Sequence, residues 1–379
     1  MTHNVRSGSE RTAFRDEETG RTLWRLTNSR MEDKHTYYDI SPWSADGRYI
    51  AFASGDPDYL SIQHRDNLAA CGGEIFVMDT EDDYALSKVA GDAFFTTHNG
   101  AHAMWHPTEP RLYYWYRAPD RIGVVDMETG EFAREMRGGI RQMSPDGKEF
   151  AWNCNDPEYR EGRGIYLMAE DGSNVRRIVS TEALYALTPN RDAFDLEDMW
   201  VQNTKWRHDS AYIMLASRTP KGSVNNYYKH IYIVSRDGSE VWWLTDYGHH
   251  HSWTPDGTQV LYCDWKHRER FEGFPREEPR LYLIDADGAN RRMVLDEPVA
   301  GHPLMDPTGT MIVTWDRKGV ILVWVEREEV EYLATFGGGF EMSHRGTHPH
   351  AVWSPDGTQI LYNSAQTGHS QIYLIPDIQ

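Results

Sequence analysis

Histidines near the end of this sequence have the residue type and spacing of a metal site. His348 and His350 are separated by one residue, and His302 lies in the preceding segment of similar pattern. Neutral imidazoles from neighbouring strands bind divalent transition metals, and two histidines one residue apart on a strand are a common half of such a site. We therefore predict a metal centre formed by His302, His348 and His350, with a fourth position open to a carboxylate.

The three histidines belong to an internal repeat. A pentapeptide similar to Trp-Ser-Pro-Asp-Gly occurs seven times, starting at Trp43, Trp105, Met143, Trp206, Trp253, Met305 and Trp353. Three residues before these starts the chain has Ile40, His102, Ile140, Asn203, His250, His302 and His350. Histidine at four of the seven equivalent positions indicates a functional position. The alternative is that these histidines only bind water in a polar channel.

Each copy of the repeat predicts a β-hairpin followed by further strands. The runs after the pentapeptide are rich in β-branched and aromatic residues, as at 49–52, 212–215 and 360–362. Third and fourth strands follow in most copies, for example at 231–234 and 241–245. Four-stranded units repeated every 40 to 60 residues, roughly, are typical of β-propellers. We predict an all-β fold, a seven-bladed β-propeller, in a single domain spanning residues 1–379.

The last repeat lacks a fourth strand of its own, because the chain ends soon after the third strand at 371–375. Residues 18–27 match a fourth strand and precede the first hairpin. We therefore expect the N-terminal strand to close the last blade, which leaves no open sheet edge between the two ends. Long connections follow the second and fourth strands of several copies, so we expect binding residues on that face.

Composition limits the partners of this protein. Its formal charge of −19 argues against nonspecific binding to nucleic acids or to anionic membranes, which require a basic surface. A small anionic ligand would need positive charge concentrated locally by arginine, lysine or a metal ion. Cys71, Cys154 and Cys263 lack the spacing of a metal knuckle, and no run resembles a secretory signal, so we expect free thiols and a cytoplasmic location.

The chain resembles the bacterial oligogalacturonate lyases. The resemblance rests most on Thr347-His348-Pro349-His350, Gly301-His302-Pro303-Leu304-Met305 and His250-His251-Ser252-Trp253, with support from Arg25-Leu26-Thr27 and Lys34-His35-Thr36-Tyr37-Tyr38. The pentapeptide itself occurs in many unrelated propellers. The resemblance implies a seven-bladed propeller that binds Mn²⁺ through His302, His348 and His350. It also implies cleavage of short uronic-acid oligosaccharides by β-elimination, the chemistry of pectin degradation.

Two positions depart from the pattern of that family. A glutamine completes the family's metal site, and the matching residue here is Arg345. Either another group fills this position, or Arg345 binds the carboxylate of the substrate. The family's essential arginine at the start of a third strand is matched by His230, next to Lys229. The residue that abstracts the proton therefore stays open.

The implied reaction assigns roles to further residues. It removes a proton next to a carboxylate, so a cation must neutralise the charge that develops there. His250 and His230 are candidates for the base, and Lys229 either lowers the pKa of its neighbours or holds the sugar. The candidates for substrate contacts are Arg345, His102, Tyr37 and Tyr38, and one of the two tyrosines, or water, would protonate the leaving group.

Other functions are compatible with the same repeats. The main alternative is a non-catalytic propeller of the WD40-like kind that binds a sugar or serves as a scaffold, and a lyase specific for glucuronate is a second. A glycosidase with paired carboxylates is weaker, because a few acidic residues on one face are expected by chance among 58 in the chain. No Gly-x-Ser-x-Gly motif of a serine hydrolase is present.

Overall fold

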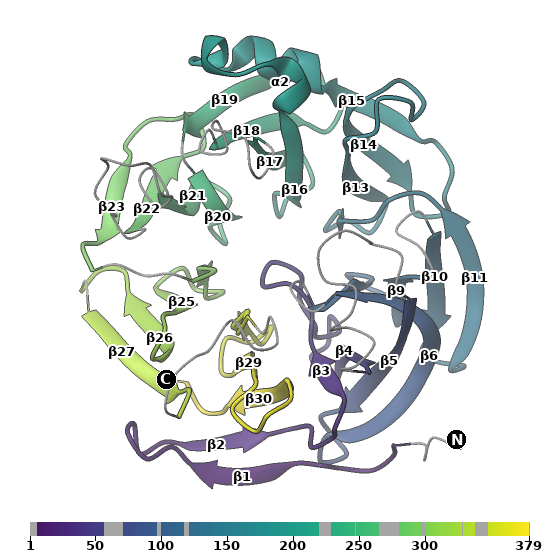
Figure 1. Ribbon diagram of the computed structural model, residues 1–379, viewed down its shortest axis with the longest axis vertical. Coiled ribbons are helices and arrows are strands. Elements are labelled where there is room, and N and C mark those ends of the chain that lie inside the picture. The colour runs from purple at the N-terminus through teal and green to yellow at the C-terminus, as the bar shows by residue number, and fades with distance from the viewer. Residues whose placement is uncertain are drawn as a thin grey trace. The chain divides into compact units, whose positions relative to one another are not determined.

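The computed structural model describes residues 6–56, 71–96, 100–116, 121–219, 229–246, 248–264, 280–297, 301–327, 329–337 and 348–378. Its strands form seven antiparallel sheets (Figure 1), which confirms the predicted seven-bladed β-propeller. By internal contacts the chain divides into two compact units, Met1–Arg137 with Asp306–Gln379, and Gly138–Met305. The expectation of a single domain stays a prediction.

The first unit contains two complete blades in its N-terminal part. One has the strand order β3-β4-β5-β6-β7, with β3 (Glu32–Lys34), β4 (Tyr49–Gly55), β5 (Cys71–Asp79), β6 (Ala85–Thr96) and β7 (Gly100–Ala101). The other has the order β11-β10-β9-β8, with β8 (Ala103–Trp105), β9 (Arg111–Trp115), β10 (Arg121–Asp126) and β11 (Glu131–Arg137).

The last blade joins the two ends of the chain, as the sequence predicts. Its strand order is β1-β2-β30-β29-β28, with β1 (Thr12–Arg15), β2 (Thr22–Arg25), β30 (Gln371–Ile375), β29 (Ile360–Ser364) and β28 (Val352–Trp353). Trp24 pairs with Leu374 and Arg25 with Tyr373. Figure 1 shows β1 and β2 lying alongside β30. The strand β1 adds a fifth member that the repeat pattern did not indicate.

The second unit contains three complete blades. The first is β12 (Gln142–Met143), β13 (Glu149–Cys154), β14 (Gly164–Ala169) and β15 (Arg176–Ser180). The second is β16 (Trp200–Trp206), β17 (Tyr212–Arg218), β18 (Lys229–Ser235) and β19 (Val241–Asp246). The third is β20 (Gly248–Trp253), β21 (Gln259–Asp264), β22 (Arg280–Asp285) and β23 (Arg292–Leu295). The remaining sheet is β24 (Leu304–Met305), β25 (Met311–Trp315), β26 (Gly319–Trp324) and β27 (Glu329–Thr335).

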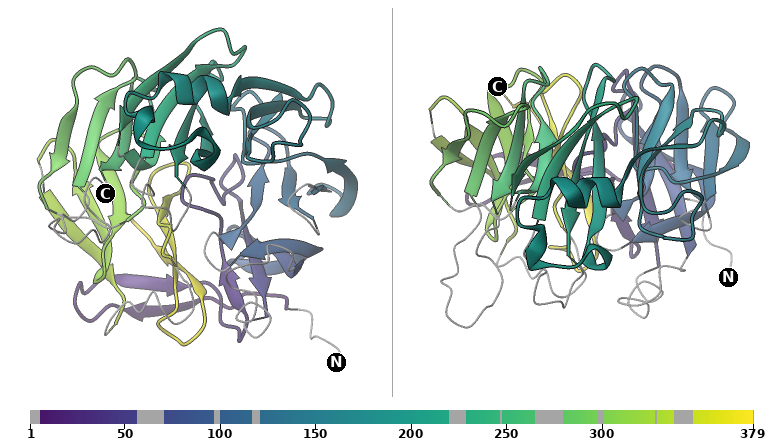
Figure 2. Two further views of the ribbon diagram at one scale, coloured as in Figure 1. Left: turned by 45° about the horizontal axis from the view of Figure 1, so that its top comes forward. Right: turned by 90° about the horizontal axis from the view of Figure 1, so that it is seen from above.

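In the part of the chain that the structure describes, helices occur in one connection of the second unit. The helix α2 (Thr181–Leu187) packs beside β15 and β19, and the 3-10 helices η1 (Arg191–Ala193) and η2 (Leu196–Asp198) follow it. Figure 2 shows this teal segment from two further sides. The hydroxyl of Ser180 caps α2 by accepting the backbone N–H of Ala183 at 3.1 Å. Among the described residues no helix is long and apolar enough to cross a membrane.

The repeated pentapeptide forms a turn that its own side chains close. In the last copy Ser354 Oγ donates to Asp356 at 2.6 Å and accepts the backbone N–H of Gln359 at 2.9 Å. Gly357 then has a φ of 73°, which glycine adopts without steric cost. The same bond from hydroxyl to carboxylate recurs in Ser44–Asp46, Ser144–Asp146 and Thr254–Asp256. The pentapeptide therefore builds the hairpins and takes no part in chemistry.

The tryptophans of the repeat connect neighbouring blades. The indole of Trp105 donates to the backbone oxygen of Pro42 at 2.7 Å. The indole of Trp253 donates to the backbone oxygen of Lys205 at 3.2 Å. Because the indoles of Trp105 and Trp253 are hydrogen-bonded within the fold, these two side chains are structural residues and not platforms for sugar rings.

The buried ammonium group of Lys34 on β3 makes the free energy of unfolding depend on pH. The residue is 1% exposed, and burial lowers the pKa of its ammonium group to about 8, although the carboxylate of Glu32 opposes this shift. The unfolded chain keeps this proton up to about pH 10.5, whereas the folded chain releases it above about pH 8. The free energy of unfolding should therefore rise with pH between these values, by about 3 kcal/mol for this one group.

The variant Lys34→Met removes the buried charge. We expect its advantage in unfolding free energy over the wild type to be largest at pH 7 and to shrink by about 3 kcal/mol as the pH approaches 10.5. Urea unfolding of both proteins across this pH range measures the difference. A difference that stays constant with pH would show that the ammonium of Lys34 does not titrate in this window.

Candidate metal centre

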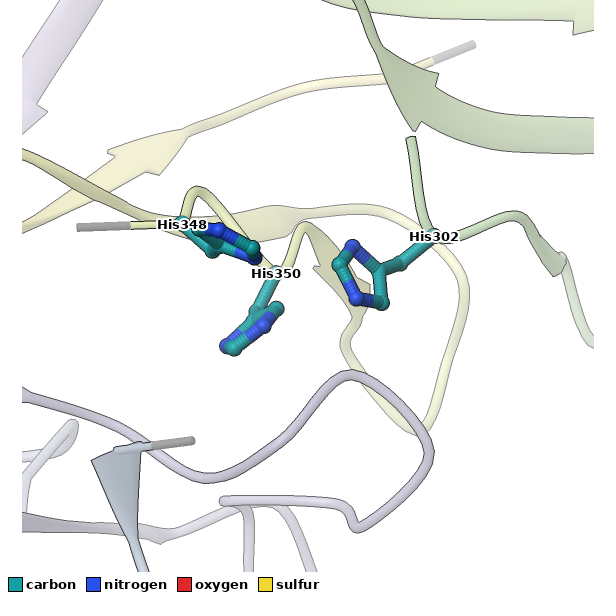
Figure 3. Close-up of side chains that lie close together, drawn as sticks. All are labelled: His302, His348 and His350. Atoms are coloured by element: carbon teal, nitrogen blue, oxygen red, sulfur yellow. The ribbon is translucent and has the colours of Figure 1, made fainter. Parts of the chain in front are cut away.

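The structure brings together the three histidines that the sequence predicts as metal ligands. Each of His302, His348 and His350 offers one ring nitrogen, and these nitrogens lie within 4.8 Å of one another (Figure 3). Nitrogen ligands about 2.1 Å from one ion are roughly 3 to 4 Å apart, so small ring rotations would suffice for coordination. Three imidazoles suit a first-row transition metal. Within the described ranges this is the one group of histidine, cysteine and acidic side chains that fits a metal.

The backbone reaches this arrangement in a way that strand alternation does not predict. His350 has a φ of 45°, and the equivalent residues Asn203 and His250 have φ values of 55° and 48°. In β20 the pairing register shifts between His249 and Ser252, which is the mark of a β-bulge. A left-handed residue turns the side chains on either side of it, so the period of two fails at these positions.

Asn363 on β29 holds the backbone of the His348–His350 segment. Its side chain is fully buried. The amide oxygen accepts the backbone N–H of His35 at 3.1 Å, and the amide nitrogen donates to the backbone oxygen of His348 at 3.4 Å. Its own backbone N–H donates to Pro349 O at 2.8 Å. Asn363 is therefore a positioning residue for two of the three candidate ligands, and the repeat alignment gave no sign of it.

Replacing Asn363 by alanine should loosen the ligands without removing any of them. We expect the affinity for a divalent metal to fall about 10- to 100-fold, the usual cost of losing an outer-shell contact. The free energy of unfolding should fall by about 1 to 3 kcal/mol, because buried polar groups lose their partners. Calorimetric metal titration and urea unfolding measure the two effects.

A matched control for Asn363→Ala is Asn155→Ala. Asn155 also bridges a neighbouring strand with both ends of its amide, accepting from Val201 N at 2.9 Å and donating to Val201 O at 2.8 Å. It should lose stability in the same range while keeping wild-type metal affinity. Equal metal affinities in the two variants would remove Asn363 from the positioning of the centre.

The ring of another histidine packs against the ring of His302. The ring of His250 stacks on the ring of His302, with centroids 3.8 Å apart and an interplanar angle of 29°. His250 Nδ1 lies 3.0 Å from the backbone oxygen of Gly301. Since a carbonyl oxygen only accepts, Nδ1 carries the proton and Nε2 is the basic atom of the neutral ring. His250 thus packs against His302, and Nε2 is the acceptor nitrogen of this tautomer.

Aromatic rings pack against the other two ligands. The ring of Tyr37 meets His350 edge to face with centroids 4.7 Å apart, and Trp315 lies 5.7 Å from His348. Tyr37 is partly exposed, whereas Tyr38 is only 1% exposed. Of the two tyrosines named from the sequence, Tyr37 is therefore the one placed to contact a bound molecule.

Positive charge gathers beside His249, in a protein whose net charge is strongly negative. Arg218 ends β17 and Lys229 begins β18, and the two are direct cross-strand partners, so their side chains share one face of the sheet. Desolvation lowers the pKa of His249 well below its usual range, and the charges of Lys229 and Arg218 add to this effect. His249 is therefore a neutral imidazole next to two cations.

Sequence reasoning missed His249 and Arg218. His249 lies outside the equivalent position of the repeat, and the bulge in β20 brings its ring to a centroid distance of 4.0 Å from that of His250. Arg218 carried no signal of its own, because it lies outside the repeated pentapeptide and the resemblance pointed to the next strand. The register of β17 with β18 is the information that reveals it.

His230 occupies a different environment from Lys229. It is 1% exposed, and its ring stacks near Phe194 with centroids 6.2 Å apart. The indole of Trp243 donates to His230 Nδ1 at 3.3 Å, and burial lowers the pKa of the imidazole to about 4. Neighbouring residues of a strand point to opposite faces, so His230 faces the core while Lys229 faces His249. The burial and the bond from Trp243 indicate a packing role, and a part for His230 in the chemistry stays a prediction.

The other residues named from the sequence have different outcomes. His102 stacks on Trp115 with centroids 4.0 Å apart and an interplanar angle of 2°, so one face of its ring is covered. The proposed contact of His102 with a substrate stays a prediction. Arg345 lies outside the described residues. Cys154 and Cys263 are free thiols, as expected.

Comparison with known proteins bears on the fold. No family model and no curated protein matches the sequence. An oligogalacturonate lyase from Vibrio parahaemolyticus matches with a TM-score of 0.70 at 16% identity, over 98% of this chain and 97% of that chain. An oligogalacturonate lyase in complex with manganese also gives a TM-score of 0.70, at 15% identity, over 99% and 98% of the two chains.

The same fold also occurs in proteins of other function. Hydrazine synthase from Kuenenia stuttgartiensis matches with a TM-score of 0.57 at 14% identity, over 89% of this chain and 95% of that chain. Identities this low establish a fold and leave function to the residues of the site. The fold of this chain is therefore that of the two oligogalacturonate lyase structures, a seven-bladed β-propeller, as the resemblance in the sequence implies.

Proposed function

We propose that this protein is a lyase that cleaves short uronic-acid oligosaccharides by metal-assisted β-elimination, leaving a product unsaturated between C4 and C5. The observation that carries the proposal is the cluster of three imidazole nitrogens within 4.8 Å. It is supported by the local cations Arg218 and Lys229 in a protein of net charge −19, which is the condition for binding an anionic substrate. It is supported further by the fold shared with oligogalacturonate lyases.

The metal would be held by His302, His348 and His350. We propose Mn²⁺, because one of the similar lyase structures is a manganese complex. When bound, the cation would neutralise the uronate carboxylate and so make the adjacent C–H bond more acidic. A set of neutral nitrogen ligands leaves the positive charge of the ion intact, which suits this task. Arg345 is a further candidate to bind that carboxylate.

Other side chains near the metal ligands would bind the substrate and transfer protons. Arg218 and Lys229 would bind a sugar carboxylate and stabilise the negative charge that develops as the proton leaves. His250 Nε2 would accept the proton from C5, since its Nδ1 proton is engaged with Gly301. As the bond from C4 to oxygen breaks, the leaving oxygen would take a proton from the hydroxyl of Tyr37 or from water.

The test is an assay for the unsaturated product. Purified protein is mixed with galacturonate and glucuronate oligomers of two to four units, with Mn²⁺ or with a chelator, and ultraviolet absorbance is followed. We expect absorbance to rise with at least one uronide in the presence of metal. The chelator should abolish it, and neutral galactose oligomers should give no signal.

Two results would contradict the proposal. No absorbance change with any uronide, with or without Mn²⁺, would leave a non-catalytic binding module as the better interpretation. Cleavage that gives a saturated product, detected as new reducing ends without absorbance, would indicate hydrolysis and would direct attention to paired carboxylates.

A further inference from the structure

A cavity of about 620 Å³ lies at the last blade, within a single unit of the structure, and none of the three histidines lines it. It is formed where β1 and β2 lie alongside β30 (Figure 1). Its size is within the range of small-molecule sites, about 300 to 1,000 Å³. Its walls include Phe14, Arg15, Asp16, Glu18, Arg25, Thr335, Gln366, Thr367 and Tyr373.

Two arginines, Arg15 and Arg25, line this cavity, and the charge of Arg25 acts on the carboxylate of Glu10. Neither Arg15 nor Arg25 forms an ion pair within the described part of the chain, although acidic residues outnumber basic ones 58 to 39. Arg25 Nε is also buried and makes no hydrogen bond to a described residue. A guanidinium presents a planar set of donors that matches a carboxylate, so two such groups in one cavity indicate an anionic ligand.

Three acidic residues, Asp16, Glu17 and Glu18, line the wall, and two of them are engaged by other groups. Asp16 accepts the backbone N–H of Thr335 at 2.7 Å, its hydroxyl at 2.9 Å, and the backbone N–H of Thr19 at 2.9 Å. Glu18 pairs with Lys318 at 3.0 Å. Asp16 and Glu18 are thus held by donors of their own, and Glu17 is the remaining carboxylate in the cavity with the two arginines.

A buried phenol, that of Tyr373, adds a further polar group to the cavity. Tyr373 is 0% exposed, and its hydroxyl makes no hydrogen bond to a described residue. The side chains of Gln366, Thr367 and Arg25 lie near this hydroxyl, where they partly offset the burial that raises the pKa of the phenol. Phe14 meets the ring of Tyr373 edge to face with centroids 5.9 Å apart. The cavity therefore combines an aromatic wall with hydroxyl, amide and guanidinium donors.

We propose that this cavity binds a small organic carboxylate of the size of a single sugar acid. Arg15 and Arg25 would bind the carboxylate, while Tyr373 and Gln366 would bind hydroxyl groups of the sugar. The proposal does not depend on the lyase reaction, because it uses no residue of the metal centre.

The test is ligand-observed NMR of the full-length protein with galacturonate, in the presence of a chelator so that a metal centre contributes nothing. We expect saturation transfer to galacturonate, with galactose, which lacks the carboxylate, binding at least tenfold more weakly. Inorganic phosphate serves as the general anion. If phosphate competes as well as galacturonate does, the cavity is only an anion site, and the sugar-acid assignment fails.

Variants of the two arginines test whether galacturonate binds in this cavity. Arg15→Gln and Arg25→Gln should each weaken galacturonate binding at least tenfold, because a charge-assisted pair is lost. Arg15 is exposed, so its replacement does not threaten the fold. Arg21→Gln is the matched control, since Arg21 lies on the same hairpin and pairs with Glu331. The cavity proposal would be overturned if Arg15→Gln and Arg25→Gln bound galacturonate as the wild type does, or if only His302→Ala lost binding. Neither result would contradict the proposed metal centre.

Discussion

Replacing His302 by alanine is expected to lower the affinity for Mn²⁺ at least about 100-fold and to abolish uronide cleavage. The variant removes one of three ligands, which should cost at least as much as loss of an outer-shell contact. It also removes the ring on which His250 stacks. His302 does not have the positive φ found at His350, so alanine adds no backbone strain there. Calorimetric titration with Mn²⁺ and the absorbance assay measure the two effects.

The matched control is His102→Ala, which removes a histidine from the equivalent position of another repeat. His102 stacks on Trp115 and is not part of the ligand cluster, so this variant should bind Mn²⁺ as the wild type does. At His350 the better substitution is asparagine, since Asn203 shows that asparagine accepts the positive φ of this position. Wild-type Mn²⁺ affinity in His302→Ala would exclude the proposed centre.

The second large effect is expected from Arg218 and Lys229, the cationic pair beside His249. Removing the charge of Lys229 or of Arg218 with glutamine should lower kcat/KM for a uronide about 10²- to 10³-fold, because charge that stabilises the developing anion is lost. Each variant should still bind Mn²⁺ normally, since neither residue is a ligand in the cluster. Steady-state kinetics at several substrate concentrations separate an effect on KM from one on kcat.

The comparison variant for the cationic pair is Arg207→Gln. Arg207 is a cation of the same blade that pairs with Asp209 at 2.6 Å in the turn that follows β16, outside the group around His249. Its loss should leave kcat/KM within about twofold, as is usual for an exposed ion pair. If the three variants lost activity equally, the effect would be one of overall charge and not of a binding site.

Much of the fold could be predicted from the sequence because its turns are local. The bond from Ser354 to Asp356 and the positive φ of Gly357 lie within four consecutive residues. Similar residues recur at this turn in other blades. Local chemistry of this kind is readable without coordinates. The pairing of β2 with β30 was also predictable, since the last repeat needs a fourth strand and one hairpin before the first repeat supplies it.

The metal cluster was predicted for a similar reason. Equivalent positions of a repeat occupy equivalent places in their blades, so His302 and His350 could be superposed by alignment alone. The one-residue spacing of His348 and His350 also indicated a shared site, although His350 is left-handed and the segment precedes β28. The cluster nevertheless forms, with Asn363 holding the backbone of this segment.

The sequence by itself determined the blade count, the closing strand and the three candidate ligands, all of which follow from local turns or from repeat equivalence. Only the tertiary structure decided that His249 lies with the cations, that His230 faces the core, and that Asn363 supports the ligands. These facts depend on a bulge, on the register of β17 with β18, and on contacts between distant segments. Such features arise from the packing of whole sheets and leave no periodic trace in the chain.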